Sequence, residues 1–187
     1  MKIISGSLKG RKIETNSKLN YRPTLSRIRE DVFNILAHNN LNKSSFGESI
    51  FADLCCGSGS IGIEALSRGC KHCYFNDVDN EQIKKISTFL KINTNFNYNF
   101  TNFDLTNLTS QIQWEKFDII YLDPPYKIKI EPIILNNINK IKNETIIITE
   151  TNYAIFSNLE PIHSKNYKNK YIRFYKGEGL KKFKPFE

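Results

Sequence analysis

The chain of 187 residues is long enough for one compact core and too short for the separate cores of a multidomain protein. Hydrophobic residues make up 40% of it and charged residues 25%, which are ordinary proportions for a globular protein. No apolar run reaches the roughly 20 residues of a membrane span, and the N-terminus lacks the apolar segment of a secretory signal. We therefore expect a soluble, cytoplasmic protein without a membrane partner, and a monomer by default.

Positive charge is concentrated at the two ends of the chain. The formal net charge is +8, and residues 1–30 and 165–187 each contribute +6, so the central body carries −4. This distribution suits the docking of a polyanion, such as a nucleic acid, on the terminal segments. The alternative is that these lysines and arginines are simply solvated and keep the protein soluble.

The four cysteines stand at positions 55, 56, 70 and 73. Cys70 and Cys73 have the C-x-x-C spacing of a zinc knuckle or a redox pair. Cys73 also begins an apolar run that is typical of a strand. We favour buried, reduced thiols and expect no metal site.

The first residues predict a basic hairpin arm. Two short strands, at residues 3–4 and 10–13, flank glycine-bearing turns. Thr24 is a suitable N-cap for a helix whose apolar residues recur at helical spacing to about His38. The polar residues 39–48 read as a linker.

Strands and helices alternate in the rest of the chain. Strands are expected at residues 50–54, 73–77, 98–102, 117–122 and 145–149, and helices at 60–68, 81–93, 105–112 and 131–141. Residues 163–167 and 171–175 flank a turn at 168–170 and predict an antiparallel hairpin. The pattern predicts an α/β fold with a mostly parallel sheet, helices on both faces and a C-terminal hairpin.

The first strand of this body runs into a glycine-rich loop. Gly57, Gly59 and Gly62 satisfy the G-x-G-x-x-G pattern, which permits a tight turn and the close approach of a ligand to the backbone. The pattern does not name the ligand. Asp53, just before the loop, would oppose the diphosphate of NAD but suits the ammonium and sulfonium of S-adenosylmethionine. Charge therefore favours the methyl donor.

Carboxylates end the next two strands. Asp77 is expected to accept the ribose hydroxyl protons, and Asp79 to cap the following helix. Asp104 lies where it could bind an adenine amino group and Phe103 where it could cover the ring, although Asp104 could equally cap a helix. Neighbouring residues in these loops complete the expected cofactor site: Cys55, Val78 and Leu105.

The fourth strand ends in Asp123-Pro124-Pro125-Tyr126, the most specific signal in the chain. Two prolines fix the backbone and remove two donors, so the loop is rigid and presents acceptors. An exocyclic amine is a poor nucleophile until acceptors hold its N–H bonds and aim the nitrogen. The Asp123 carboxylate and the Pro124 carbonyl can do this, with Asp123 as the nearest base, and Tyr126 can stack on the base ring. The alternative is a stiff turn that only ends a strand.

The sequence resembles the bacterial small-subunit ribosomal RNA guanine-N2 methyltransferases over nearly its whole length. The likeness rests on residues 3–6, 10–12, 22–24, 27–30, 33–36, 53–59, 64–69 and 123–126. It implies a Rossmann-like class I methyltransferase fold with a seven-stranded sheet over residues 41–187 and an RNA-contacting extension over residues 1–40. Departures from the family pattern occur at Cys55, Cys56, Asn76 and Asp77, and they weaken the role given to Asp77.

The resemblance also implies a reaction and its partners. Methyl transfer from S-adenosylmethionine to one guanine of 16S ribosomal RNA would yield S-adenosylhomocysteine, with the 30S subunit or a late assembly intermediate as the substrate particle. Tyr126 with the basic region of Arg11, Arg22, Thr24 and Arg27 would contact the RNA, and the target base must be unpaired or flipped. The alternatives are a DNA or other amine methylase that uses the same loop, and an inactive assembly factor that binds ribosomal RNA.

Overall fold

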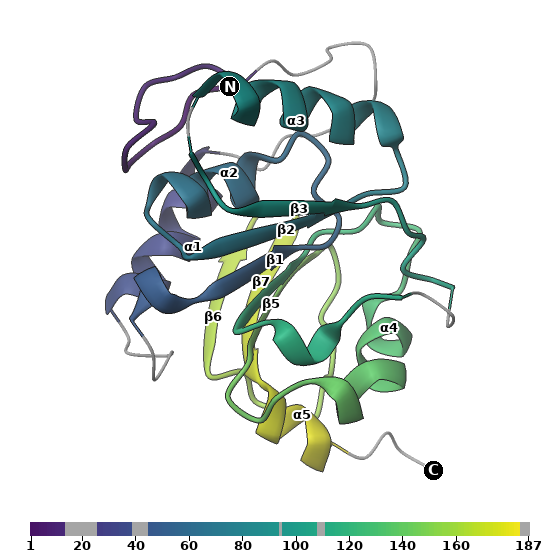
Figure 1. The fold of residues 1–187 in the computed structure, drawn as a ribbon. Coiled ribbons are helices and arrows are strands. Elements are labelled where there is room, and N and C mark those ends of the chain that lie inside the picture. The colour runs from purple at the N-terminus through teal and green to yellow at the C-terminus, as the bar shows by residue number, and fades with distance from the viewer. Residues whose placement is uncertain (14–25, 39–44, 94, 108–110, 184–187) are drawn as a thin grey trace.

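The computed structural model describes residues 1–13, 26–38, 45–93, 95–107 and 111–183, and shows one sheet with helices on both faces (Figure 1). The helices are α1 (Ser26–His38), α2 (Ser60–Ser67), α3 (Asn80–Asn93), α4 (Ile130–Asn137) and α5 (Gly177–Lys182), with short 3-10 helices η1 (Phe46–Glu48), η2 (Trp114–Lys116) and η3 (Ile138–Lys140). The strands are β1 (Ile50–Asp53), β2 (His72–Asn76), β3 (Tyr98–Thr101), β4 (Ile119–Leu122), β5 (Ile146–Thr151), β6 (His163–Tyr167) and β7 (Lys170–Lys176). No described helix has the length and apolar character that crossing a bilayer requires.

The seven strands follow the order β3-β2-β1-β4-β5-β7-β6. β1 to β5 are parallel, whereas β7 is antiparallel to β5 and to β6. The order reverses between β1 and β4, and ligands of open α/β sheets bind outside the carboxyl ends of the strands at such a point. The predicted sheet and its C-terminal hairpin are confirmed.

Alternating side chains of the strands supply a separate core on each face of the sheet. Phe51 of β1 packs with residues of α1, α2 and α3, whereas its neighbour Ala52 packs on the opposite side with residues of α4 and α5. β4 and β5 alternate in the same way, with Ile119 and Ile120 in different cores. Both faces of the central strands are therefore covered, which is why these strands are almost wholly apolar.

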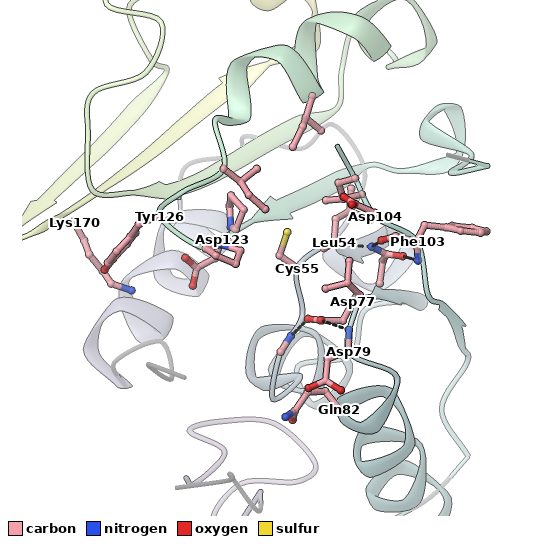
Figure 2. Close-up of a pocket in the computed structure, with 18 residues that line it drawn as sticks. Leu54, Cys55, Asp77, Asp79, Gln82, Phe103, Asp104, Asp123, Tyr126 and Lys170 are labelled. Atoms are coloured by element: carbon pink, nitrogen blue, oxygen red, sulfur yellow. Dashed lines mark hydrogen bonds between the residues drawn. The ribbon is translucent and has the colours of Figure 1, made fainter. Parts of the chain in front are cut away.

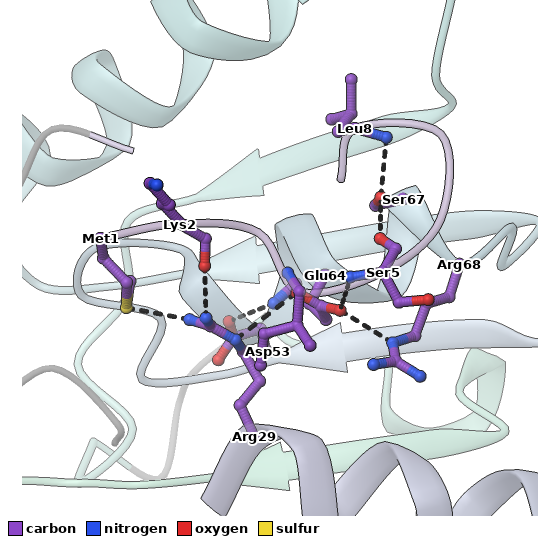
Figure 3. A network of polar contacts seen from close by, with 11 residues as sticks. Met1, Lys2, Ser5, Leu8, Arg29, Asp53, Glu64, Ser67 and Arg68 are labelled. Atoms are coloured by element: carbon purple, nitrogen blue, oxygen red, sulfur yellow. Dashed lines mark hydrogen bonds and ion pairs between the residues drawn. The ribbon is translucent and has the colours of Figure 1, made fainter. Parts of the chain in front are cut away.

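The N-terminal hairpin packs on the body of the protein. Residues 1–13 turn back on themselves with a single bridge, between Lys2 and Lys12, in place of two regular strands. Ile4 and Ser5 donate backbone N–H groups to the Glu64 carboxylate of α2 at 2.8 and 2.9 Å (Figure 3). Ile3, Leu8 and Ile13 are buried in the core that α1, α2 and α3 share. The segment is thus anchored along its length and is not a free arm.

Arg29 belongs to this packed region. It is one of the N-terminal basic residues that could have been solvated, but its side chain is fully buried. Its Nε lies 3.5 Å from Glu64, and its guanidinium donates to the Lys2 carbonyl (Figure 3). Glu64 thus balances the positive charge of Arg29. Without such a partner, a buried cation would be very costly to the stability of the fold. The predicted N-cap Thr24 lies outside the described residues.

The prediction of a helix at residues 105–112 is wrong for those residues of the range that the structure describes. Residues 105 and 106 form a turn, and residues 107, 111 and 112 belong to no helix. The Asp104 carboxylate accepts the backbone N–H and the hydroxyl of Thr106, at 2.8 and 2.7 Å. A side chain that satisfies the backbone locally competes with helix formation, and this explains the turn.

Candidate active site

A cavity of about 440 Å³ opens at the carboxyl ends of β1, β2, β3 and β4, beside the point where the strand order reverses (Figure 2). Its volume is in the range of small-molecule sites. Eighteen residues line it: Leu54, Cys55, Gly57, Asn76, Asp77, Val78, Asp79, Gln82, Phe103, Asp104, Leu105, Asp123, Pro124, Pro125, Tyr126, Ile128, Ile133 and Lys170. The structure therefore brings the predicted catalytic loop and most of the predicted cofactor residues to one cavity.

The glycine loop after β1 forms one wall of the cavity. Gly57 and Gly59 have φ values of 49° and 73°, which are left-handed conformations that side chains disfavour. Gly57 lines the cavity, whereas Gly59 precedes α2 and lies against Ile86, where an added Cβ would come within 2.8 Å of that side chain. Gly59 shapes the loop without facing the cavity.

Asp53 lies beneath this loop and does not line the cavity. Its carboxylate is 2% exposed and accepts the backbone N–H of Gly62 at 2.9 Å. Burial, with smaller contributions from the nearby Asp77 and Asp123 carboxylates, raises the pKa of Asp53 to about 7 against the opposing effect of the Gly62 hydrogen bond. In this structure the Asp53 side chain anchors the start of α2. Its expected contact with a cationic ligand stays a prediction.

Asp77 joins two loops of the cavity. Its carboxylate accepts the N–H of Gly57 at 2.7 Å and the N–H of Asp79 at 2.9 Å (Figure 2). Asp79 in turn accepts the N–H of Glu81 at 2.9 Å, so its predicted role as a helix cap is confirmed. Val78, between them, is 64% exposed on the cavity rim.

Asn76 places the loop after β3. Its side chain donates to the Leu54 and Phe103 carbonyls and accepts from the Phe103 N–H and the Thr101 hydroxyl. Phe103, Asp104 and the buried Leu105 are thereby held on the cavity wall. Hydrogen bonds from Thr106 lower the pKa of Asp104. The carboxylate caps a turn, so its expected alternative role as a helix cap is wrong.

The lining is strongly acidic. Asp77, Asp79, Asp104 and Asp123 face the cavity, and among the described residues that line it Lys170 is the one cation. The Gly57 N–H, which a diphosphate would need, is already bonded to Asp77. The site therefore disfavours a dinucleotide and suits a ligand with cationic groups and hydroxyl donors.

The Asp123–Tyr126 loop closes the other end of the cavity. Burial raises the pKa of Asp123 to about 6, and the positive charge of Lys170 opposes this rise. Pro124 is buried, and Tyr126 is 44% exposed with its ring at the cavity rim. A partly buried carboxylate, a rigid backbone and an accessible aromatic ring thus stand together where β4 ends.

The cysteines separate into one cavity residue and three core residues. Cys55 lines the cavity, whereas Cys56, Cys70 and Cys73 are buried elsewhere, and all four are free thiols. Burial raises the pKa of Cys70 to about 12 and that of Cys73 well above its usual range. Within the described ranges, no group of three His, Cys, Asp or Glu side chains could hold a metal ion.

The predicted RNA-contacting residues are only partly described. Arg11 is exposed and donates to Asn93 at the end of α3, and Arg27 is exposed on α1. Arg22 and Thr24 lie outside the described residues. Tyr167 of β6 donates to Asp31 of α1, so the C-terminal hairpin contacts the helix that carries Arg27.

Sequence reasoning missed several residues of the site. Lys170 was expected in a hairpin turn, but it is the first residue of β7 and is buried. Gln82, Ile128 and Ile133 look like ordinary helix and loop residues, and only tertiary structure brings them to the cavity. Asn76 carried a signal, because a polar residue at the end of an apolar strand requires hydrogen-bond partners.

The family model described as conserved hypothetical protein 95 matches residues 1–176. The chain belongs to this family. It is 33% identical to the putative rRNA methyltransferase YlbH of Bacillus subtilis, with 80% of this chain and 82% of that one covered. It is 31% identical to ribosomal RNA small subunit methyltransferase D of Buchnera aphidicola from Baizongia pistaciae, with 93% and 89% covered.

Solved structures agree on the fold. A putative methyltransferase, yhhF, from Escherichia coli matches with a TM-score of 0.76 at 24% identity, and the match covers 94% of this chain and 97% of that one. The predicted Rossmann-like class I methyltransferase fold and the predicted membership of the methyltransferase D family are confirmed.

Proposed function

We propose that this protein transfers a methyl group from S-adenosylmethionine to the N2 amine of one guanine in 16S ribosomal RNA, and the resemblance points to guanine 966. One observation carries the proposal: an acid-lined cavity for a cationic ligand and the Asp123–Tyr126 loop share a single space. The names of the relatives, ribosomal RNA methyltransferases in Bacillus and Buchnera, support an RNA substrate.

The donor set of the cavity fits S-adenosylmethionine. Asp77 would accept the ribose hydroxyls, and Asp104 the adenine amine. Phe103, Val78 and Leu105 would cover the ring, and Cys55 and Gly57 would lie along the rest of the molecule. Asp53 supports the loop and adds negative charge beneath it. When bound, this cofactor supplies a methyl carbon activated by a sulfonium and leaves as S-adenosylhomocysteine.

The diproline loop would hold the attacking amine. The Asp123 carboxylate and the Pro124 carbonyl accept one N–H each and aim the nitrogen lone pair at the methyl carbon, while Tyr126 stacks on the base. These residues would hold the nitrogen in line while the bound donor supplied the methyl group, with the C–S bond broken as the N–C bond formed and its electron pair left on sulfur. The amine proton then passes to Asp123 or through it to solvent.

A basic surface would bind the RNA backbone. In this proposal residues 1–40 form the RNA-contacting extension, with Arg11, Arg22, Thr24 and Arg27 at the interface, and residues 41–187 form the methyltransferase domain. The RNA-binding surface would extend from α1 to the basic β6–β7 hairpin. The contact of Tyr167 with Asp31, which joins these two elements, supports this extension. We further propose that the protein acts as a cytoplasmic monomer on the 30S subunit or on a late assembly intermediate.

Incubation with labelled S-adenosylmethionine tests the function. The protein is given naked 16S RNA, 30S subunits from cells that lack this gene, and duplex DNA, and the methylated nucleotides are mapped by mass spectrometry. We expect N2-methylguanosine at one position of the small-subunit RNA. Label in DNA alone would favour a DNA methylase, and tight RNA binding without any transfer would favour an assembly factor.

A further inference from the structure

A buried cation stands beside the catalytic loop. Lys170 begins β7, is 7% exposed, and lines the same cavity as Asp123 and Tyr126. In Figure 2, Lys170, Tyr126 and Asp123 lie at one end of the cavity, and Asp77 and Asp104 lie at the other. Lysines are seldom buried unless they are paired, so this position requires an explanation.

Two buried side chains fix Lys170. Its ammonium donates to Glu150 of β5, and Glu150 also accepts the hydroxyl proton of Tyr121. Glu150 and Tyr121 are each 1% exposed. Tyr121 precedes Asp123 by two residues, so neighbouring strands β4, β5 and β7 all contribute to one polar chain that ends at the catalytic loop.

The charges around Asp123 indicate what the hydrogen-bonded side chains of Lys170, Glu150 and Tyr121 do. Asp53, from the β1 side, is electrostatically coupled to Asp123, because the Asp123 charge raises the pKa of Asp53. Burial raises the pKa of Asp123 itself, whereas the charge of Lys170 lowers it. Stability alone does not account for the ion pair, because well-packed apolar residues commonly replace such pairs without loss.

We propose that Lys170, anchored by Glu150 and Tyr121, is a positioning residue that keeps the Asp123 carboxylate ionised and oriented to accept an N–H of the substrate amine. This inference rests on the proposed function, in which Asp123 holds that amine. Removal of the cation leaves Asp123 protonated at higher pH, and a protonated carboxyl offers the amine one acceptor fewer.

The test variant is Lys170→Met combined with Glu150→Gln, which removes both charges of the pair and leaves no buried ion alone. Carbon-13 NMR follows the titration of the Asp123 carboxyl, with the resonance assigned by its loss in Asp123→Asn. We expect the midpoint to move to higher pH, but by less than the loss of the cation alone would give, because the loss of the Glu150 charge acts in the opposite direction. Lys170→Gln, which leaves Glu150 in place and keeps a donor for it, is the second variant and should move the midpoint to higher pH by about one pH unit or more.

Two controls separate this role from a general effect of charge. Lys116→Met removes one positive charge from an exposed side chain of η2, at the opposite end of β4, and should leave the midpoint unchanged. Lys170→Arg keeps a cation and should restore most of the wild-type titration. An unmoved midpoint in Lys170→Gln, or an equal shift in Lys116→Met, overturns the proposal.

Kinetics then connect the titration to catalysis. Single-turnover rates between pH 5 and 8 should show the acid limb of the double variant displaced by the same amount as the NMR midpoint, whereas a purely structural role would lower the rate equally at every pH. The titration needs no methyl acceptor. Absence of RNA methylation by the wild-type protein would therefore sink the proposed function, and the NMR result would still decide the effect of Lys170 on Asp123.

Discussion

The carboxylate of Asp77 accepts the backbone N–H of Gly57 at 2.7 Å, and this contact ties the loop after β1 to the end of β2. A second hydrogen bond, from the Asp79 N–H at 2.9 Å, connects the same carboxylate to the entry of α3. One side chain therefore sets the shape of the cavity at the end expected to hold the cofactor.

Asp77→Asn should weaken binding of S-adenosylmethionine by about tenfold or more, because an amide can satisfy one of the two N–H groups and turns its own donors toward the other. Isothermal titration calorimetry measures the change in Kd. Asp118→Asn is the matched control: Asp118 also accepts a backbone N–H, from Ile50 at 2.9 Å, but it does not line the cavity. Equal losses of affinity in both variants would contradict the role given to Asp77.

Asp53 should make stability depend on pH. Its folded pKa of about 7 lies above the usual 3.8, so the folded protein binds the extra proton between these values and loses stability as pH rises through that range. The loss is about 4 kcal/mol when complete. Asp53→Asn, which keeps an acceptor for Gly62, should remove this dependence. Urea unfolding at pH 5 and pH 8 checks it, and a stability difference between variant and wild type that does not change with pH would count against it.

Tyr126→Ala should raise the KM for RNA by about tenfold, since stacking of a base on an aromatic ring contributes about 1–3 kcal/mol. The Kd for S-adenosylmethionine should change little, because the ring is 44% exposed on the cavity rim. Tyr126→Phe keeps the ring and should behave like the wild type. A similar loss in both variants would assign the effect to the hydroxyl group.

Glu64→Gln should destabilise the fold by about 3–5 kcal/mol, because it leaves the buried Arg29 without its carboxylate partner. Glu48→Gln breaks the exposed pair with Lys71 and should cost less than about 1 kcal/mol. Denaturant midpoints of the two variants provide the comparison. Equal midpoints would show that the buried network does not anchor the N-terminal segment.

Much of the fold could be predicted from the sequence because apolar strands and amphipathic helices alternate along it. The ends of β1 and β4 were predictable too, since Asp53 and Asp123 interrupt apolar runs. The failure at residues 105–112 has a local cause, because Asp104 satisfies the backbone of a turn.

Other parts of the site depend on tertiary structure. The spacing of residues in the sequence does not reveal that Lys170 is paired with Glu150, or that Arg29 is buried beside Glu64. Both are charged residues in basic segments, and the interpretation of such residues as solvated is reasonable until their partners are known. The place of Asp53 at the end of β1 was predictable, but its burial beneath the loop, outside the cavity lining, was not.

Single-turnover methyl transfer by Asp123→Asn, measured beside wild type on small-subunit RNA at saturating S-adenosylmethionine, tests the central claim most directly. The variant should bind the cofactor with an unchanged Kd and transfer methyl at least about 100-fold more slowly, because the amine loses its charged acceptor and its base. Transfer within about twofold of the wild-type rate would show that the Asp123–Tyr126 loop does not hold the reacting nitrogen.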